Sequence, residues 1–338
     1  MFTSNRMSLR HLSATAVAAI ALSFSAACGD DFEEIEAPET CTQALTCEAH
    51  VFLQVDQFEY LRQNEAITVL DARNEELYAD GHIPGALHGN WRDFVNPDKN
   101  GILWEDEQTL EDAAQALGIN NDDTIAVYGA GDGSGGDSPA GRLYWTLQYL
   151  GHDDIYLVNG GLESWLDANY GALQAGATDV EPGDFTVDIR PERRATVDEV
   201  EQAIEDETLR IVDTRRMEEW VGDNDRNNPR VGYIPEAIHY HWEDVFDENN
   251  ELRPKEEIRA ELEELDIEPG TLTIPYCQSG VRSGFFYAVL QWLDYPDPKN
   301  YDGSWWEWSR DDDLVAMLDG EPSDQTVESD DADQPTEE

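Results

Sequence analysis

One cysteine lies where a thiol is expected to become reactive. An apolar run at residues 272–276 ends at Cys277, and a second apolar run at residues 285–293 predicts a helix. Cys277 is therefore expected on a strand-to-helix loop, where backbone N–H groups and the positive end of a helix dipole face the sulfur. Such surroundings lower a thiol pKa and favour the nucleophilic thiolate. Arg282 adds a positive charge. The alternative is a buried cysteine that acts as a small hydrophobe, but the polar neighbours of Cys277 argue against it.

The spacing within this loop narrows the chemistry. Four residues separate Cys277 from Arg282, and they are Gln278, Ser279, Gly280 and Val281. The phosphate-binding loops of cysteine phosphatases hold one residue more between their Cys and Arg. A loop that is shorter by one residue suits an electrophile smaller than phosphate.

Charge excludes several classes of partner. The 338 residues contain 21 Lys and Arg against 74 Asp and Glu, for a formal net charge of −53. Nucleic-acid binding needs a basic face, so no nucleic-acid partner is expected. Direct electrostatic attraction to anionic lipid is also disfavoured. A strongly acidic surface affects the solubility of a protein and does not indicate its fold.

The N-terminus predicts export. Arg6, Arg10 and His11 precede an uncharged stretch at residues 12–27, which is short for a membrane span and ends at Ala27-Cys28. This junction resembles a bacterial lipobox, although Ser25 stands where Leu is usual. The resemblance implies a lipidated Cys28 and a periplasmic or cell-surface lipoprotein that touches the membrane only through its lipid. Cleavage without lipidation is the alternative.

Two further cysteines, Cys41 and Cys47, lie close together in the sequence. In an oxidising compartment they could form a disulfide and leave Cys277 free. Metal binding by this pair is disfavoured, because no second cysteine pair or histidine cluster accompanies it. We therefore expect no metal site and no cofactor.

The chain contains one pattern twice, which indicates two homologous domains. The markers keep the same order in both copies, and the second copy has an insertion at residues 222–230. The paired segments are VLDAR at 69–73 and IVDTR at 211–215, GHIPGA at 81–86 and GYIPEA at 232–237, VYG at 127–129 and PYC at 275–277, and NGG at 159–161 and DGS at 302–304.

Each copy alternates apolar runs with helical patterns, which predicts an α/β fold with a parallel sheet and helices on both faces. Ligands in such sheets bind beyond the carboxyl ends of strands, where Cys277 is placed. The expected strands are 66–71, 124–128, 155–158, 209–213 and 272–276, and the expected helices are 110–117, 140–150, 197–204 and 255–265. The expected organisation is a signal peptide at 1–27, an acidic tether at 28–49, a first domain at 50–170, a linker at 171–195, a second domain at 196–312 and an acidic disordered tail at 313–338.

Together these motifs resemble the tandem-domain rhodaneses, sulfurtransferases that carry a sulfane sulfur on cysteine. The likeness covers residues 50–312 and rests on the Asp-x-Arg strand ends, the turn at 81–86, the Cys277 loop and YDGSWWEW at 301–308. It implies two rhodanese-like domains, of which the first has lost its cysteine and the second performs the chemistry. Gly129 stands in the first copy where Cys277 stands in the second.

The resemblance also implies a mechanism and a set of site residues. Cys277 would attack the outer sulfur of an anionic donor and become a persulfide, from which cyanide or a thiol would remove the sulfur. Arg215 would face the cysteine and hold the donor anion, although a structural arginine beside Asp213 is the alternative, and the adjacent Arg216 could substitute. Arg73, its counterpart in the first copy, would be structural. The loop residues expected to bind the donor are Gln278, Ser279, Gly280, Val281, Arg282 and Ser283.

The loop favours thiosulfate as donor by a narrow margin. Thiosulfate enzymes of the family typically have Arg and Lys where this chain has Gln278 and Ser279. Mercaptopyruvate enzymes typically have Gly-Ser-Gly-Val-Thr there, and residues 279–281 agree with that pattern while Arg282 does not. Arg282 and Arg215 suit a compact dianion, which favours thiosulfate.

Other functions stay open from the sequence. One is a 3-mercaptopyruvate sulfurtransferase. Another is a persulfide carrier or redox-sensing module that passes sulfur to a protein instead of turning over small acceptors. A relative of cysteine phosphatases or arsenate reductases is disfavoured by the short loop. The sequence sets neither the physiological acceptor nor the oligomeric state.

Overall fold

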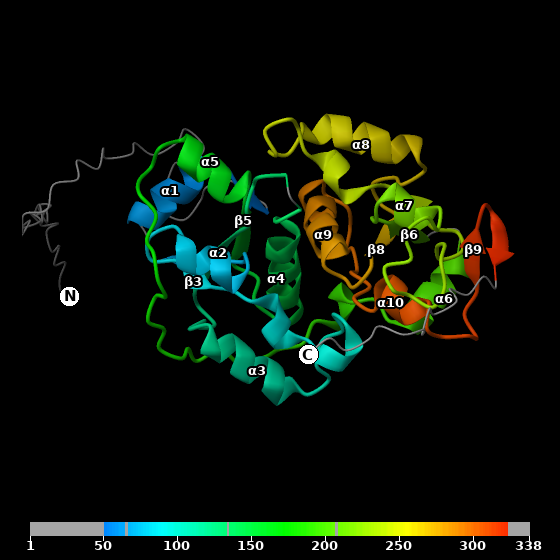
Figure 1. Ribbon diagram of the computed structural model, residues 1–338, viewed down its shortest axis with the longest axis horizontal. Coiled ribbons are helices and arrows are strands. Elements are labelled where there is room, and N and C mark those ends of the chain that lie inside the picture. Colours follow the sequence, from blue (N-terminus) through cyan, green and yellow to red (C-terminus); the bar gives the residue numbers. More distant parts are fainter. Residues whose placement is uncertain (1–50, 65–66, 134, 207–208, 324–338) are drawn as a thin grey trace, which may run out of the picture. The chain divides into compact units, whose positions relative to one another are not determined.

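The computed structural model describes residues 51–64, 67–133, 135–206 and 209–323 (Figure 1). These residues form two α/β domains, each with a parallel sheet flanked by helices, which confirms the predicted fold class. The predicted signal peptide, the tether and the cysteines Cys28, Cys41 and Cys47 lie outside the described residues. Within the described residues, no helix has both the length and the apolar character needed to cross a membrane.

The first domain contains a five-stranded sheet in the order β1-β5-β4-β2-β3, in which neighbouring strands run parallel. Its central strands are short apolar runs whose residues are mostly buried, as expected for a sheet covered on both faces. Asp71 at the end of β2 lies opposite Tyr128 at the end of β4. The strands are β1 Phe52–Leu53, β2 Ile67–Asp71, β3 Leu87–His88, β4 Thr124–Tyr128 and β5 Ile155–Val158.

The second domain repeats the centre of this arrangement. Its described strands are β6 Leu209–Asp213, β7 Ile238–His239 and β8 Leu272–Tyr276, in the order β7-β6-β8 and all parallel. Asp213 lies opposite Tyr276, just as Asp71 lies opposite Tyr128. The register therefore brings the carboxyl ends of β6 and β8 together, and the residues that follow them share one edge of the sheet.

The helices begin where local capping permits. Asp106 accepts a hydrogen bond from Thr109 N at the start of α3, and Thr196 forms a capping box with Glu199 at the start of α6. The helices are α1 Val55–Asn64, α2 Glu75–Asp80, α3 Glu107–Ala116, α4 Ser138–Tyr149, α5 Gly161–Asp167, α6 Val197–Glu205, α7 Met217–Trp220, α8 Lys255–Glu264, α9 Arg282–Trp292 and α10 Ser304–Trp308.

The two domains meet through α4 and α9, which are buried along most of their lengths and lie side by side (Figure 1). A Cβ atom at Gly141 would collide with the backbone of Phe285, so glycine permits the close approach of the two helices. The apolar core around them includes residues of both domains. Each helix therefore buries one part of its surface against its own domain and another part against the other domain.

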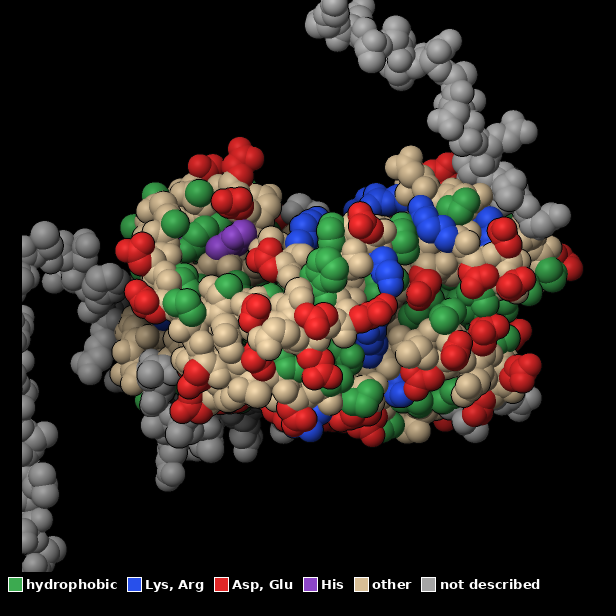
Figure 2. All heavy atoms as spheres, turned by 90° about the horizontal axis from the view of Figure 1, so that it is seen from below, with side chains coloured by type: hydrophobic (Ala, Val, Ile, Leu, Met, Phe, Trp, Pro, Cys, Tyr) green, Lys and Arg blue, Asp and Glu red, His purple; other side chains and the backbone are tan. Residues whose placement is uncertain are grey.

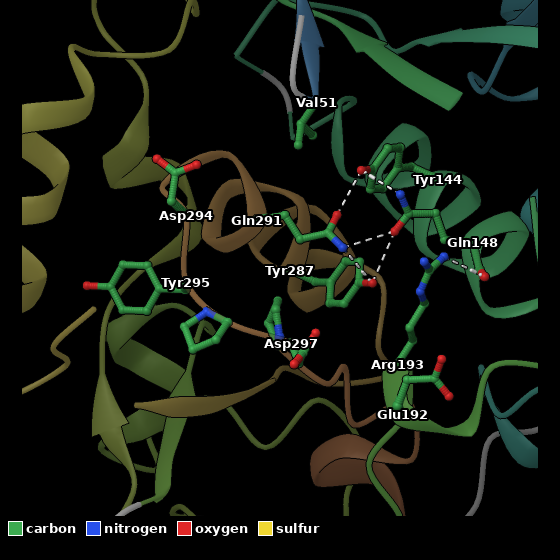
Figure 3. Close-up of a pocket in the computed structure, with 12 residues that line it drawn as sticks. Val51, Tyr144, Gln148, Glu192, Arg193, Tyr287, Gln291, Asp294, Tyr295 and Asp297 are labelled. Carbon is green, nitrogen blue, oxygen red and sulfur yellow. Dashed lines mark hydrogen bonds between the residues drawn. The ribbon is translucent and has the colours of Figure 1, made fainter. Parts of the chain in front are cut away.

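A polar network crosses this contact with a near two-fold symmetry (Figure 3). Tyr144 Oη donates to Gln291 Oε1 over 2.8 Å, and Tyr287 Oη donates to Gln148 Oε1 over 3.0 Å. Tyr144 and Gln148 of α4 thus mirror Tyr287 and Gln291 of α9. A cavity of about 440 Å³ opens beside this network.

The start of the predicted tail is folded, which corrects the expectation of disorder from residue 313. β9 Ala316–Leu318 and β10 Glu321–Ser323 form an antiparallel hairpin. Tyr233 and Met317 exchange two backbone hydrogen bonds of 2.9 and 2.8 Å. Leu314 and Ala316 are buried in the apolar cluster of the second domain, and Arg230 donates to Leu314 O, so apolar and polar contacts together hold an otherwise acidic segment.

Candidate active site

The structure places Cys277 directly after β8 and five residues before the start of α9 at Arg282. The strand is apolar up to Tyr276, and the helix starts without a side-chain N-cap bond from Val281. The loop between them therefore leaves helix N–H groups turned toward the cysteine. Cys277 is only 1% exposed, so its thiol lies beneath the surface of the domain.

Ser304 holds the two ends of this loop. Its Oγ accepts hydrogen bonds from Cys277 N over 3.1 Å and from Gly280 N over 2.9 Å, and it donates to Tyr301 O over 2.7 Å. Ser304 has a left-handed φ of 52°, an unusual conformation for a non-glycine residue. One hydroxyl from the DGS segment thus fixes the loop around the sulfur.

The surroundings of Cys277 favour its thiolate. Burial alone would raise the pKa of the Cys277 thiol, but the charge of Arg282 and hydrogen bonds from Ser283 and Ser279 outweigh burial and lower that pKa below its ordinary value. Ser283 Oγ lies 3.6 Å from the sulfur and 2.7 Å from Asn300 Oδ1. The thiol is therefore buried, as the simple hydrophobic alternative required, and also activated.

Arg282 is fixed by a carboxylate that the sequence analysis did not identify. Its Nη1 and Nη2 donate to the two oxygens of Glu219 over 2.6 and 2.9 Å. Burial raises the pKa of Glu219, but the hydrogen bonds and charge of Arg282 lower that pKa by more. The pKa of Glu219 therefore lies below its ordinary value. Glu219 is buried, with a side-chain exposure of 2%, whereas Arg282 is partly exposed at 16%. Glu219 therefore sets the direction of the guanidinium that acts on Cys277.

A cavity of about 230 Å³ opens above this ion pair. Three arginines line it in a chain that is otherwise strongly acidic: Arg216, Arg226 and Arg282. The view in Figure 2 shows acidic side chains spread widely over one face, with the basic ones gathered toward its middle and upper edge. Two carboxylates also line it: Glu219, which pairs with Arg282, and Glu243, which lies 3.6 Å from Arg216. Gly135 and Ser138 of the first domain form another part of the wall. The arginines outnumber the carboxylates, so the cavity suits a small anion.

The insertion at residues 222–230 supplies part of this site. Arg226 is exposed at the cavity, whereas Asn228 is buried and exchanges two amide hydrogen bonds with Gln278 over 2.9 and 3.0 Å. The Gln278 amide, which was expected to bind the donor, is thus bonded to the insertion. The sequence identified the insertion, but nothing in its pattern indicated that it contacts the cysteine loop.

The other loop residues contribute mainly through their backbones. Gly280 adopts φ +72°, donates to Ser304 and accepts from Arg142 over 3.1 Å. Ser279 is in contact with Gly101 of the first domain. Val281 packs against the apolar core.

Arg215 lies in a buried ion pair. Its Nε and Nη2 donate to Asp213 over 2.9 and 2.6 Å, and Nη2 also donates to Gly232 O over 2.7 Å. Two of its three guanidinium nitrogens are therefore committed to the fold. Arg73 makes the same bonds to Asp71 and Gly81 O in the first domain, which has no cysteine at the equivalent loop.

The first domain has closed the corresponding site. A Cβ atom at Gly129 would collide with Asp137, whose carboxylate accepts a hydrogen bond from Gly131 N over 3.1 Å. Burial raises the pKa of Asp137 to about 7. A carboxyl group thus fills the space beside Gly129, where the second domain holds a thiol.

Among the side chains that the structure describes, no group of three or more His, Cys, Asp and Glu residues could hold a metal ion. The site combines one activated thiol with Arg282, which acts on that thiol and also lines the cavity. Such a site can accept a small anionic electrophile at sulfur.

Comparison with known families agrees with this geometry. The Rhodanese-like domain family matches residues 54–168 and 196–311. The chain is 31% identical over 272 residues to the sulfur carrier protein TtuD of Thermus thermophilus, covering 76% of this chain and 93% of the relative. It is 32% identical over 250 residues to the thiosulfate sulfurtransferase of Pseudomonas aeruginosa, covering 72% and 88%.

A solved structure shares the fold. The anaerobic ergothioneine biosynthesis enzyme from Chlorobium limicola, in complex with trimethyl histidine, aligns with a TM-score of 0.69 and 26% identity. The alignment covers 80% of this chain and 70% of that one.

Proposed function

This chain belongs to the rhodanese family, and we propose that it is a thiosulfate sulfurtransferase with a persulfide on Cys277 as its intermediate. The observation that carries the proposal is the Cys277 thiol, whose pKa is lowered despite its burial by Arg282, a residue that also lines a cavity with Arg216 and Arg226. Sulfurtransferase activity agrees with the names of the relatives. The choice of donor rests on the charges of the cavity.

In the first half-reaction the Cys277 thiolate attacks the outer sulfur of thiosulfate. A new S–S bond forms, the bond between the two thiosulfate sulfurs breaks, and its electron pair leaves with sulfite. Arg282 stabilises the thiolate, and Arg216 and Arg226 neutralise the donor dianion as it enters. Arg215 would bind the donor through Nη1, the guanidinium nitrogen that bonds neither Asp213 nor Gly232.

In the second half-reaction an acceptor such as cyanide or a thiol attacks the outer sulfur of the persulfide. The persulfide bond breaks, and its electron pair returns to Cys277 as a thiolate. The backbone N–H groups of Ser279 and Ser283 that favour the thiolate would favour the persulfide anion in the same way. No external oxidant or reductant is needed for the cycle.

A parallel assay with thiosulfate and 3-mercaptopyruvate, with cyanide as acceptor, tests the donor. Faster turnover with thiosulfate is expected, because three arginines at the cavity favour a compact dianion over a monocarboxylate. Preference for 3-mercaptopyruvate would assign the chain to that activity instead.

A persulfide carrier is the second candidate, because one relative is a sulfur carrier protein. A carrier would form the persulfide at the enzymatic rate but release sulfur slowly to cyanide and rapidly to a protein acceptor. Single-turnover measurement of the second half-reaction separates the two. The 1% exposure of Cys277 favours a small acceptor.

We further propose that the protein is exported and anchored by a lipid on Cys28, with Cys41 and Cys47 joined as a disulfide. The uncharged stretch at residues 12–27 supports this. Mass spectrometry of the mature N-terminus should find acyl chains on Cys28, and a free amine there would remove the lipid anchor while leaving export in place. Alkylation of non-reduced protein should label Cys277 alone, whereas a label on Cys41 or Cys47 would contradict the disulfide.

A further inference from the structure

A buried arginine of the first domain contacts the catalytic loop of the second. Arg142 on α4 is 0% exposed. Its Nη1 donates to Gly280 O over 3.1 Å, and its Nη2 donates to Gly101 O over 2.5 Å. Burying a guanidinium is costly unless its charge and donors are used. Here both bonds end on backbone carbonyls, and one of those carbonyls belongs to the loop that carries Cys277.

The bond from Arg142 completes a clamp on Gly280. Ser304 of the second domain accepts from Gly280 N, while Arg142 of the first domain donates to Gly280 O. Gly280 itself has φ +72°, and a Cβ atom there would collide with Arg142. The peptide groups on both sides of Gly280 are therefore fixed, one by each domain.

The first domain touches the loop at a second point. Gly101 has φ +112°, and a Cβ atom there would collide with the backbone of Ser279. The same turn presents Gly101 O to Arg142. Arg142 thus ties a turn of its own domain to the catalytic loop, with Ser279 packed between them.

Arg142 also contributes charge. Its nearest carboxylate, Asp302, lies 3.9 Å away and is engaged by Arg194 at 2.8 Å. Burial lowers the pKa of Arg142 to about 10, so the group remains a cation at neutral pH, and it interacts favourably with the Cys277 thiolate. The charged side chains around the loop are Arg282 with Glu219, Arg215 and Asp302 from the second domain, and Arg142 and Arg194 from outside it.

We propose that Arg142 is a positioning residue through which the first domain, itself without a nucleophile, holds the Cys277 loop in its reactive conformation. This inference rests on the proposed function only in taking Cys277 as the reactive thiol. It does not depend on which donor supplies the sulfur.

The test compares Arg142→Met and Arg142→Lys with a matched control, Arg73→Met. Met keeps much of the apolar stem, whereas Lys keeps a cationic head but cannot bond two carbonyls at once. Arg73 is also a buried arginine of the first domain. Its side chain bonds to Asp71 and Gly81 and lies 5.9 Å from the Tyr128 ring, so it controls for lost stability. Two quantities are measured: the pH dependence of Cys277 alkylation by iodoacetamide, and the rate of persulfide formation from thiosulfate.

Arg142→Met should raise the midpoint of the alkylation profile by about one pH unit and slow persulfide formation about tenfold. Arg142→Lys should fall between Arg142→Met and the wild type, and Arg73→Met should match the wild type in both readouts. If Arg142→Met does not fold, Arg142→Lys carries the test. Equal values for the Arg142 variants and Arg73→Met would overturn the proposal.

The alkylation arm needs no sulfur donor. A shifted alkylation profile without thiosulfate activity would therefore contradict the proposed donor and uphold the role of Arg142. Unshifted profiles with full thiosulfate activity would do the reverse.

Discussion

In both domains the aspartate of the Asp-x-Arg segment forms a buried ion pair with the arginine of that segment. The same aspartate also accepts a hydrogen bond from a tyrosine. Tyr128 Oη donates to Asp71 over 2.6 Å in the first domain, and Tyr276 Oη donates to Asp213 over 2.6 Å in the second. The same tyrosines accept from the N–H of the Ile-Pro turn. The frame below the loop is thus the same in both domains, whether or not the loop carries a nucleophile.

The difference lies in the residues that follow the tyrosine. In the second domain Cys277 is surrounded by N–H groups and Arg282, whereas in the first domain Asp137 fills the space beside Gly129. A thiolate needs positive surroundings, and the first domain offers a buried carboxyl group instead. The comparison shows that the shared ion pair supports the architecture, while a short loop decides the chemistry.

The largest effect is expected from exchanging the nucleophile. Cys277→Ser should abolish sulfur transfer, because a hydroxyl is a weaker nucleophile at neutral pH and cannot form a persulfide. Adding Gly129→Cys to Cys277→Ser should not restore transfer, since Asp137 blocks that position. Mass spectrometry after incubation with thiosulfate should show one added sulfur atom in the wild type only. An added sulfur at residue 129 would show that the first site is still open.

Arg282→Ala should slow persulfide formation about ten- to a hundredfold, as expected for losing a charge-assisted interaction of roughly 1.5–3 kcal/mol. Because Arg282 lowers the pKa of Cys277, the alkylation profile should also move to higher pH. The substitution leaves Glu219 buried without its partner, so the control is Arg282→Ala with Glu219→Gln. The double variant should recover stability but not rate, and recovery of both would make Arg282 structural.

Arg215→Ala and Arg73→Ala test whether the arginine of the ion pair in the second domain also binds the donor. Each removes one partner of a buried pair and should destabilise the fold similarly, by about 3–5 kcal/mol. Only Arg215→Ala should slow persulfide formation, by about tenfold, if its remaining nitrogen holds the donor. Thermal unfolding and single-turnover rates measure the two effects. Identical rates for both variants would mean that Arg215 has only a structural role.

At the closed site the expected effect is on stability alone, with none on sulfur transfer. The pKa of Asp137 is raised to about 7 in the folded state, above the value of about 3.9 for an unfolded chain. Its contribution to stability is therefore present below about pH 4 and is lost as pH rises through about 7. As pH rises across this range, the free energy of unfolding of Asp137→Asn should increase relative to that of the wild type, by up to about 4 kcal/mol. Denaturant unfolding at pH 5 and pH 8 measures this difference, with the exposed Asp122→Asn as control. A constant difference would mean that Asp137 is ionised in the fold.

The sequence predicted the parts of this molecule that depend on local pattern. The five predicted strands appear within one residue of their expected bounds, because short apolar runs of this kind are specific for covered parallel strands. The loop position of Cys277 followed from the same pattern. The edge strands β3 and β7 have two residues each, too few to produce a periodic signal.

Long-range contacts could not be predicted in this way. Glu219, Asn228 and Arg142 reach the catalytic loop from three different elements, and no spacing in the sequence links them to it. The bonding of Gln278 to the insertion depends equally on tertiary structure. Which polar side chains are committed to the fold, and which remain for a donor, is decided by packing between segments that are distant in sequence.

The contact between α4 and α9 has a consequence for how the chain is made. Translation completes α4 long before α9 exists, so the helix first emerges with its interdomain surface uncovered. Gly141 and Tyr144, which contact α9 in the finished protein, then face solvent or other chains. Exposed apolar surface of this kind promotes aggregation of folding intermediates. Because the two domains cover each other at this contact, the chain is most prone to aggregate after α4 has been synthesised and before α9 has been.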